Sequence, residues 1–321
     1  MIKKRLKVGV LFGGKSAEHE VSVASAHNII NALDKKKYQI TPIKINKNGE
    51  FNINNLKKFD VIFPVLHGPF GEDGSVQGLL KILNLPFVGA GILGSAVGMD
   101  KDIMKRLLRE AKIPIPKSLV FHKGDVLSFA KIKKILGLPL FIKPANMGSS
   151  VGISKVSHPL NFNKAIKKAF QYDTKIIIEE FIDGREVECS VLGNENPIAS
   201  VPGEIITSDD FYSYEAKYIT ASTTVTNAKF KPKTKRKIQE LAIRAYQTLN
   251  CEGMGRVDFL LRKNDEVLVN EINTIPGFTD ISMYPKLWEA TGLSQTKLLD
   301  RLIDLAIERF ERERKLKTTF K

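Results

Sequence analysis

Two runs of alternating apolar and polar residues, 255–262 and 267–273, constrain the fold of this chain more than any other feature. They flank Asn264–Asp265, a pair suited to a tight turn, so the runs are expected to form an antiparallel hairpin. Residues two apart in a strand share a face. A turn centred on Asn264–Asp265 therefore brings four polar side chains onto one face, with Asp258 opposite Glu271 and Arg256 opposite Asn273.

This polar face predicts a metal site. Two carboxylates directly across a ladder repel each other, and a divalent cation would remove that repulsion. Oxygen ligands from Asp258, Glu271 and the amide of Asn273 suit Mg²⁺, with phosphates completing its coordination. Arg256 beside the metal would stabilise developing negative charge. The alternative is a polar face on which Arg256 itself bridges the acids, and these residues alone leave both possibilities open.

A second candidate site begins at Lys143, which ends an apolar strand and precedes a loop rich in glycine and serine, residues 144–152. The glycines permit close backbone approach, and Ser149–Ser150 offer hydroxyl and N–H donors, so the loop suits phosphates. An ordinary hairpin with a flexible tip is the alternative. Further along, a strand ending near Glu179 leads into residues 180–186, where an edge backbone could contact adenine and a carboxylate could accept ribose hydroxyls.

The first ninety-odd residues alternate strand-like and helix-like segments, which predicts a parallel sheet. Residues 9–16 literally satisfy the P-loop pattern. However, Val10–Phe12 are expected to complete an apolar strand, which leaves only Gly13–Gly14 for a turn. We therefore favour a strand that presents residues 15–20 at the carboxyl edge of the sheet, where α/β ligand sites lie. There, Glu18 is either a helix-dipole partner or an anchor for a substrate ammonium.

Composition narrows the class of protein. With 321 residues, 43% hydrophobic and 26% charged, the chain is expected to form two or three globular domains. Two cysteines, no apolar run of membrane-spanning length and no signal-peptide core indicate a cytoplasmic protein without a membrane partner. The 50 basic and 35 acidic residues give a net charge of +15. The lysines are scattered along the chain, which favours a solvated surface over a nucleic-acid-binding face. We therefore expect no nucleic-acid partner.

Seven segments in this order resemble the D-alanine–D-alanine ligase family of the ATP-grasp superfamily, and the resemblance covers essentially the whole chain. It implies an α/β and α+β multidomain protein of ATP-grasp architecture: an N-terminal parallel α/β (pre-ATP-grasp) domain over 1–98, a central subdomain with a phosphate-covering loop over 99–190, and a C-terminal subdomain with a Mg²⁺-binding hairpin and a substrate lid over 191–321. The segments are 16–22, 67–68 with 71–74, 99–101, 143–152, 214–218, 255–258 and 270–277.

The family joins two D-alanines with ATP, through a D-alanyl phosphate, for peptidoglycan precursors. The resemblance implies this activity for the chain, with ligases that make D-Ala–D-lactate or D-Ala–D-Ser as the alternative. Tyr218, between Lys217 and Ile219, matches the dipeptide-forming type. The polar and aromatic stretch 209–224 is expected to be a lid that closes with the loop around Ser149. The resemblance also suggests a homodimer formed largely through the N-terminal module.

The resemblance assigns individual roles as well. The nucleotide would contact Lys101, Lys143, Ser149, Ser150, Glu179, Glu180, Phe181, Ile182, Glu186, Lys217, Asn270 and Glu271. Two Mg²⁺ ions, for which Mn²⁺ can substitute, would be bound by Asp258, Glu271 and Asn273. The first D-alanine would be held by Glu18, linked through Ser149 to Tyr218, and by His67. Arg256 and the Gly277 N–H would stabilise the oxyanion, and Lys217 and Ser282 would bind the second D-alanine.

Overall fold

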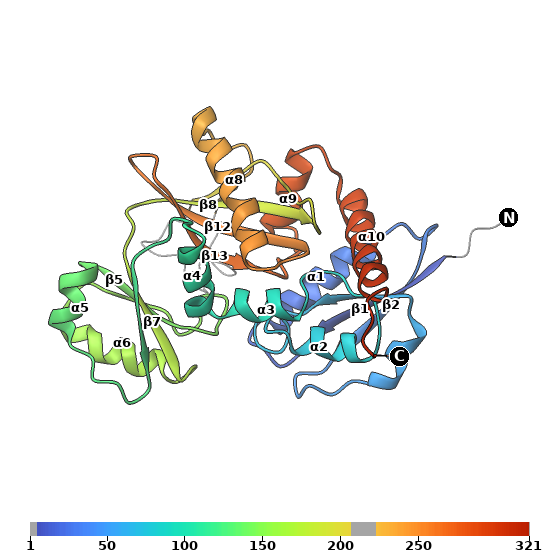
Figure 1. The fold of residues 1–321 in the computed structure, drawn as a ribbon, viewed down its shortest axis with the longest axis horizontal. Coiled ribbons are helices and arrows are strands. Elements are labelled where there is room, and N and C mark those ends of the chain that lie inside the picture. Colours follow the sequence, from blue (N-terminus) through green and yellow to red (C-terminus); the bar gives the residue numbers. More distant parts are fainter. Residues whose placement is uncertain (1–4, 207–222, 321) are drawn as a thin grey trace.

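The computed structural model describes residues 5–206 and 223–320, which form three sheets spread along the long axis of the molecule (Figure 1). A parallel three-stranded sheet lies at one end and an antiparallel four-stranded sheet at the other. A six-stranded sheet lies between them. Loops from all three sheets meet where the described site residues gather.

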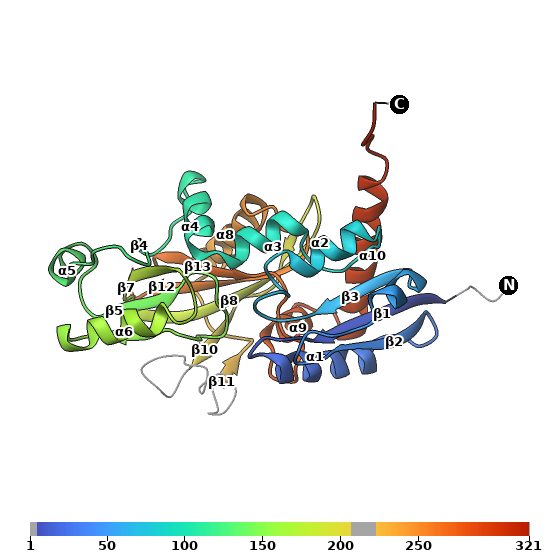
Figure 2. The ribbon, with the colours of Figure 1, turned by 90° about the horizontal axis from the view of Figure 1, so that it is seen from below.

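The N-terminal module is the predicted parallel sheet, with strand order β2-β1-β3. Side chains alternate across it: Val8, Val10 and Phe12 of β1 enter one core, whereas Leu11 enters another on the opposite face. Figure 2 shows α1 below the sheet and α2 above it. The elements are β1 (Leu6–Gly13), α1 (His19–Ala32), β2 (Tyr38–Ile45), the 3₁₀ helix η1 (Ile53–Lys58), β3 (Val61–Val65), α2 (Ser75–Ile82) and α3 (Ile92–Met99).

The central module is an antiparallel sheet of order β4-β7-β5-β6, with α5 and α6 packed on its apolar face. Ile176 and Ile178 of β7 fill this core, whereas Ile177 between them is buried outside it, as the alternation of side chains along a strand predicts. The elements are α4 (Lys101–Glu110), β4 (Ser118–His122), α5 (Phe129–Leu136), β5 (Leu140–Pro144), β6 (Ser154–Val156), the 3₁₀ helix η2 (Pro159–Asn161), α6 (Phe162–Ala169) and β7 (Lys175–Glu180).

The C-terminal module is built on the order β11-β10-β8-β12-β13, with β9 paired to β8. Its helix α8 covers β8, β12 and β13 with an apolar stripe at helical spacing. The elements are β8 (Gly184–Gly193), β9 (Ile198–Ala199), β10 (Gly203–Ile206), β11 (Thr223–Val225), α8 (Pro232–Thr248), β12 (Gly253–Arg262), β13 (Val267–Asn273), α9 (Met283–Ala290) and α10 (Gln295–Glu313).

Two helices pack against a module other than the one in which they stand by sequence. Helix α4 places Met104 and Leu108 in the core of the C-terminal sheet. Helix α10 packs its apolar stripe against β1, β3 and α1 of the N-terminal module, beside which it stands in Figures 1 and 2. The expected boundary between residues 190 and 191 falls inside β8, in mid-strand.

The predicted pairing at the acids of the hairpin is confirmed. Asp258 lies opposite Glu271, and Arg256 lies opposite Asn273. All four share one face of the β12–β13 pair, as their even spacing predicts. The hairpin therefore delivers two carboxylates, an amide and a guanidinium to one side of the sheet.

The predicted two-residue turn is wrong, although the register at the acids is right. The N–H of Arg262 bonds to the Glu266 carbonyl at 3.0 Å, so the loop has three residues, 263–265. Asp265, at φ 65°, takes the left-handed conformation that closes such a loop. This loop alone would shift the pairing by one residue. A bulge at Asn270, where Phe259 pairs with Val269, restores it at the acids.

The P-loop interpretation is excluded by the conformation of β1. Val10, Leu11 and Phe12 lie within the strand, so they cannot form an open loop around phosphates. Gly13 and Gly14 make the predicted turn, with φ angles of 95° and 91°. A Cβ on Gly13 would lie 2.3 Å from the carbonyl oxygen of Ile45, so glycine is required there.

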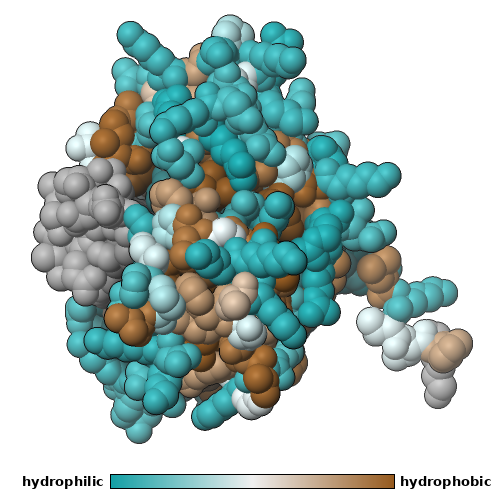
Figure 3. Space-filling model, turned by 90° about the vertical axis from the view of Figure 1, so that its left-hand side faces the viewer, coloured by the Kyte–Doolittle hydropathy of each residue, from teal (hydrophilic) through white to brown (hydrophobic). Residues whose placement is uncertain are grey.

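Exposed lysines account for part of the net charge. On α5 and α6, Lys131, Lys133, Lys134, Lys164, Lys167 and Lys168 all face solvent. Figure 3, which views the molecule from this end, shows a mainly hydrophilic surface with scattered apolar patches. Across residues 5–206 and 223–320, no helix combines the length and apolar character that crossing a membrane requires.

Candidate active site

Two adjoining pockets contain every predicted site residue that the structure describes. One lies between the N-terminal module, the loop at 147–149 and the segment after β13. The other lies between the central sheet and the β8–β12–β13 face. They share Lys101, Ser149 and Glu271, so a ligand in one pocket can reach a ligand in the other. The site forms at the junction of the three modules, where no single module could build it.

In the first pocket, Glu18 meets the loop predicted to cover phosphates. The Ser149 hydroxyl donates to a Glu18 carboxylate oxygen, which joins the start of α1 to the central module. Ser149 and Ser150 both have left-handed backbones, at φ 48° and 59°. Such conformations are strained for residues other than glycine and concentrate at functional sites.

His67 and Glu72 lie behind Glu18, at the carboxyl edge of the N-terminal sheet. Burial lowers the pKa of His67, which favours the neutral imidazole. Burial, followed by the nearby Glu18 carboxylate, raises the pKa of Glu72 to about 8. The Gly68 N–H donates to Glu72 at 2.6 Å and fixes its orientation. This end of the pocket therefore holds neutral polar groups around one carboxylate.

The polar face of the hairpin is held together by Arg256. Its guanidinium donates to both oxygens of Asp258, at 2.7 Å each, and lies 3.1 Å from Glu188 on β8. Arg256 thus bridges acids, as one of the two interpretations expected. The acids are Asp258 and Glu188, however, and Glu271 instead faces Lys101, with 3.6 Å between Nζ and Oε2.

The predicted metal ligands are nevertheless brought together. Asp258 and Glu271 are paired across the ladder, and Asn273 lies two residues beyond Glu271 on the same face. The side-chain oxygen of Asn273 accepts from the Ile275 N–H at 3.1 Å. No group of three or more Asp, Glu, His or Cys side chains suited to a metal occurs in the described parts of the chain. The donor set here is two carboxylates and an amide, which fits a magnesium ion that shares its coordination with phosphates.

In the second pocket, two lysines converge on one buried carboxylate. Glu179 of β7 pairs with Lys143 at 2.6 Å and with Lys105 of α4 at 2.9 Å. Burial by itself would raise the pKa of Glu179, but the two ammonium groups outweigh it and hold the pKa at about 2. Glu179 is therefore fully ionised in the native protein.

The segment predicted to contact adenine lines the same pocket. It contains Glu180, Phe181, Ile182 and, on β8, Glu186. The Glu180 amide donates to the Lys117 carbonyl at 3.0 Å, and its carboxylate accepts from the Lys117 N–H at 2.8 Å. The backbone of this edge is thereby fixed beside the pocket.

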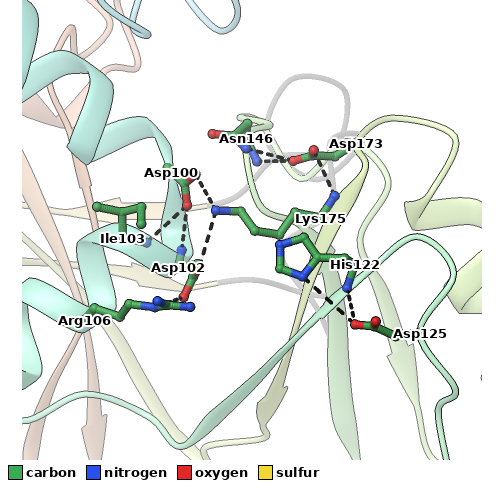
Figure 4. A network of polar contacts seen from close by, with 9 residues as sticks. All are labelled: Asp100, Asp102, Ile103, Arg106, His122, Asp125, Asn146, Asp173 and Lys175. Carbon is green, nitrogen blue, oxygen red and sulfur yellow. Dashed lines mark hydrogen bonds and ion pairs between the residues drawn. The ribbon is translucent and has the colours of Figure 1, made fainter.

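A polar network connects the start of α4, β7 and the base of the loop that is predicted to bind phosphates (Figure 4). Lys175 reaches from β7 to Asp100 at 2.6 Å and to Asp102 at 3.4 Å, both at the start of α4. Asp173 accepts from the backbone N–H and side-chain amide of Asn146. Lys101, next to Asp100, donates to the Met147 carbonyl at 2.7 Å. The network fixes Lys101 and the base of the serine loop relative to each other.

Gly277 and Ser282 lie together before α9, in the first pocket. A Cβ on Gly277 would lie 2.7 Å from the Ser282 hydroxyl, so a side chain there would have to displace that hydroxyl. The Ser282 hydroxyl accepts from the Thr279 N–H at 2.9 Å. The residues therefore present a backbone N–H and a hydroxyl at adjacent positions.

Sequence reasoning missed three residues of the site: Lys105, Glu188 and Glu72. Lys105 interrupts the apolar stripe of its helix between Met104 and Leu108, a signal that a buried partner was needed. Glu188 lies two residues after Glu186 in β8 and so shares its face. Lys217, Tyr218 and all but the last two residues of the expected lid lie outside the described residues. Those last two, Thr223 and Thr224, belong to β11.

Comparison with known proteins agrees with this arrangement. The family of the D-ala D-ala ligase C-terminus matches residues 107–304, and that of the D-ala D-ala ligase N-terminus matches residues 7–57 and 51–90. The D-alanine–D-alanine ligase of Oceanobacillus iheyensis is 48% identical, over 98% of each chain. The chain belongs to the D-alanine–D-alanine ligase family.

Solved structures of the family show the same fold. The D-alanine–D-alanine ligase of Coxiella burnetii superposes with a TM-score of 0.88 at 40% identity, covering 98% of this chain and 97% of that one. The Bacillus anthracis ligase complexed with ATP gives 0.84 at 31% identity, covering 96% and 99%. The predictions of an ATP-grasp architecture and of a ligase are confirmed, and family membership implies the use of ATP.

Proposed function

We propose that the two adjoining pockets join two D-alanine molecules, with ATP in the second pocket and the amino acids in the first. The observation that carries this proposal is that Glu18, Ser149, Arg256 and Glu271 all line the first pocket, while Ser149 and Glu271 also line the second. Glu18 supplies a carboxylate for the ammonium of the first D-alanine, and Ser149 positions that carboxylate. His67 lines the same pocket as Glu18 and would contact the same substrate.

A carboxylate is a poor electrophile, so the first D-alanine is phosphorylated by the γ-phosphate of ATP. The amine of the second D-alanine attacks the acyl phosphate, and the tetrahedral intermediate loses phosphate. Both steps concentrate negative charge. Lys101 and Lys143 would offset the charge of the phosphates, and Arg256 with the Gly277 N–H would offset that of the oxyanion.

The three ligands Asp258, Glu271 and Asn273 would hold two Mg²⁺ ions, or Mn²⁺ in their place. When bound, the metal neutralises phosphate oxygens and so makes the γ-phosphate a better electrophile. Arg256 occupies both oxygens of Asp258 in this structure. Each of these oxygens keeps a second lone pair, so Asp258 could bind a metal while Arg256 remains in place.

The second D-alanine would place its carboxylate at Lys217 and at Ser282, which precedes α9, with Tyr218 joining the Glu18–Ser149 pair. Ligation to D-lactate or D-serine is not favoured, because the relatives named above are D-alanine–D-alanine ligases. We further propose a homodimer formed through the N-terminal module and a cytoplasmic location. We also propose a division of labour between the three domains expected over 1–98, 99–190 and 191–321, with the last boundary moved to the start of β8 so that this strand stays whole.

Phosphate release and dipeptide formation, measured with ATP, Mg²⁺ and D-alanine, test the proposal. Arg256→Met should lower kcat by about 100-fold, because an oxyanion donor is lost, while ATP still binds. Lys263→Met, an exposed lysine in the turn of the same hairpin, is the control and should keep full activity. Absence of D-alanine-dependent turnover in the unaltered protein would reject the function. Competition between D-alanine, D-lactate and D-serine at several pH values identifies the second substrate.

A further inference from the structure

Of the lysines that form ion pairs within residues 5–206 and 223–320, Lys105 is the most deeply buried. The function proposed above gives it no role. Its side chain is 2% exposed, although a buried ammonium is costly without partners. Its Nζ lies 2.9 Å from Oε1 of Glu179 and donates to the Asn270 carbonyl at 3.2 Å. Burial lowers the pKa of Lys105, and the Glu179 carboxylate opposes that shift.

Lys105 and Lys143 pair with different oxygens of Glu179. Lys143 pairs with Oε2 of Glu179 and lines the nucleotide pocket, with 12% of its side chain exposed. Lys105 pairs with Oε1 and is absent from the lining of that pocket. One lysine therefore faces the ligand, and the other stands behind the carboxylate that both share.

This arrangement bears on how Lys143 becomes available to a phosphate. In the structure, Lys143 is held by Glu179 at 2.6 Å. Moving Lys143 toward a phosphate from a carboxylate with no other cation would leave a buried, uncompensated charge, which is strongly unfavourable. Lys105 removes this penalty because it remains beside Glu179 whichever partner Lys143 takes.

We propose that Lys105 is a positioning residue that stays on Glu179 as its permanent counter-ion and thereby lets Lys143 transfer to the phosphates of ATP. This inference rests on the proposed function, which places ATP in the second pocket. The bond from Lys105 to Asn270 has a second effect. It ties α4 to the bulge of β13, beside Glu271, so the counter-ion is fixed relative to the hairpin.

The test compares the affinities of ATP and of adenosine, which has the same base and ribose but no phosphate. Both dissociation constants are measured by calorimetry in the same Mg²⁺ buffer, without D-alanine. In Lys105→Met, ATP should bind at least about tenfold more weakly, whereas adenosine affinity should stay within about twofold. Arg109→Met removes an exposed charge from the same helix and should leave both affinities unchanged.

A second variant separates this role from a general contribution to folding. In Glu179→Gln, Lys143 has no carboxylate to hold it, so adding Lys105→Met should not change the ratio of adenosine to ATP dissociation constants. Equal losses for both ligands in Lys105→Met, or a further fall of the ratio in the double variant, would overturn the proposal. If Lys105→Met does not fold, the comparison of Glu179→Gln with the double variant still decides.

The outcome also distinguishes this proposal from the one on which it rests. If the unaltered protein binds ATP no more tightly than adenosine, the assignment of the second pocket to ATP is wrong. If the unaltered protein binds ATP more tightly than adenosine and Lys105→Met has the same ratio of the two dissociation constants, only the proposed role of Lys105 is wrong.

Discussion

At the scale of single residues, the charged groups of the site are already paired with one another. A ligand that binds one of these groups either joins or replaces an existing ion pair. Its affinity therefore depends on the contacts that the original partner retains. The pairs concerned are Lys143 with Glu179, Arg256 with Asp258, and Lys101 with Glu271. Burial makes such exchanges sensitive to the loss of any one charge.

Gly277→Ala tests the close approach before α9. The added methyl would lie 2.7 Å from the Ser282 hydroxyl and should displace it, which raises the KM for D-alanine by about tenfold. Gly91→Ala is the matched control, since a Cβ there meets no atom within 4 Å. Steady-state kinetics measures both. An unchanged KM in Gly277→Ala would show that Ser282 does not bind the substrate.

Glu72→Gln tests the buried carboxyl through the pH dependence of stability. The pKa of Glu72 rises from an ordinary 4.5 to about 8 in the folded protein. Between these values the native state keeps a proton that the unfolded state loses, so the free energy of unfolding falls as pH rises, by at most about 1.4 kcal/mol per unit. The variant should lack this fall. Denaturant unfolding at pH 5, 6, 7 and 8 checks it, and parallel curves for the two proteins would contradict it.

At the scale of elements, the site depends on irregularities as much as on regular structure. The bulge at Asn270 lets a three-residue turn coexist with the pairing of Asp258 and Glu271. It also places the carbonyl that Lys105 contacts. A regular hairpin with the same turn would move one row of side chains to the other face.

Asp100→Ala tests the start of α4. Asp100 accepts from the N–H groups of Asp102 and Ile103 and pairs with Lys175. Its loss should lower the free energy of unfolding by about 1–2 kcal/mol and weaken ATP binding, because Lys101 follows directly. Calorimetry and chemical unfolding measure the two effects.

Ser128→Ala is the control for this change. Ser128 caps α5 by accepting from the Lys131 N–H at 3.4 Å, far along the central module from the serine loop. It should lower stability without altering ATP affinity. Equal ATP affinities in Asp100→Ala and the unaltered protein would limit Asp100 to a structural role.

At the scale of the whole molecule, α10 joins the end of the chain to its beginning. Its apolar stripe fills the core beneath β1 and β3. Arg309, 4% exposed, donates to the carbonyls of Phe87 and Gly89, and its guanidinium lies 4.4 Å from the Phe87 ring. The two ends of the sequence thus form one folding unit around the N-terminal sheet.

Arg309→Met should therefore destabilise the molecule by about 2–4 kcal/mol, because two buried carbonyls lose their donors. Arg314→Met removes an exposed arginine whose one ion pair within residues 5–206 and 223–320 is with Glu311. It should change stability by less than about 0.5 kcal/mol. Chemical unfolding followed by circular dichroism measures both. A small effect in Arg309→Met would show that α10 is held by its apolar contacts alone.

The sequence by itself determined the elements and the faces of the site. Periodicity placed α1, α8, α10 and the β12–β13 hairpin, because alternation and helical spacing report which side chains are buried. It also placed Asp258 and Glu271 on one face and rejected the P-loop interpretation at Val10–Phe12. Secondary structure and the face on which a side chain lies are local properties, because residues close in sequence determine them.

Only the tertiary structure decided which charges meet. Lys105 and Glu179 are 74 positions apart, so no local pattern pairs them. The contact between Glu18 and Ser149, 131 positions apart, was expected from the family resemblance alone. The partner of Arg256 on β8, the bulge at Asn270 and the docking of α10 also depend on how sheets and helices pack. Burial then keeps Glu72 protonated, and two lysines keep Glu179 ionised, because the cost of a charge depends on what surrounds it in space, not on its neighbours in sequence.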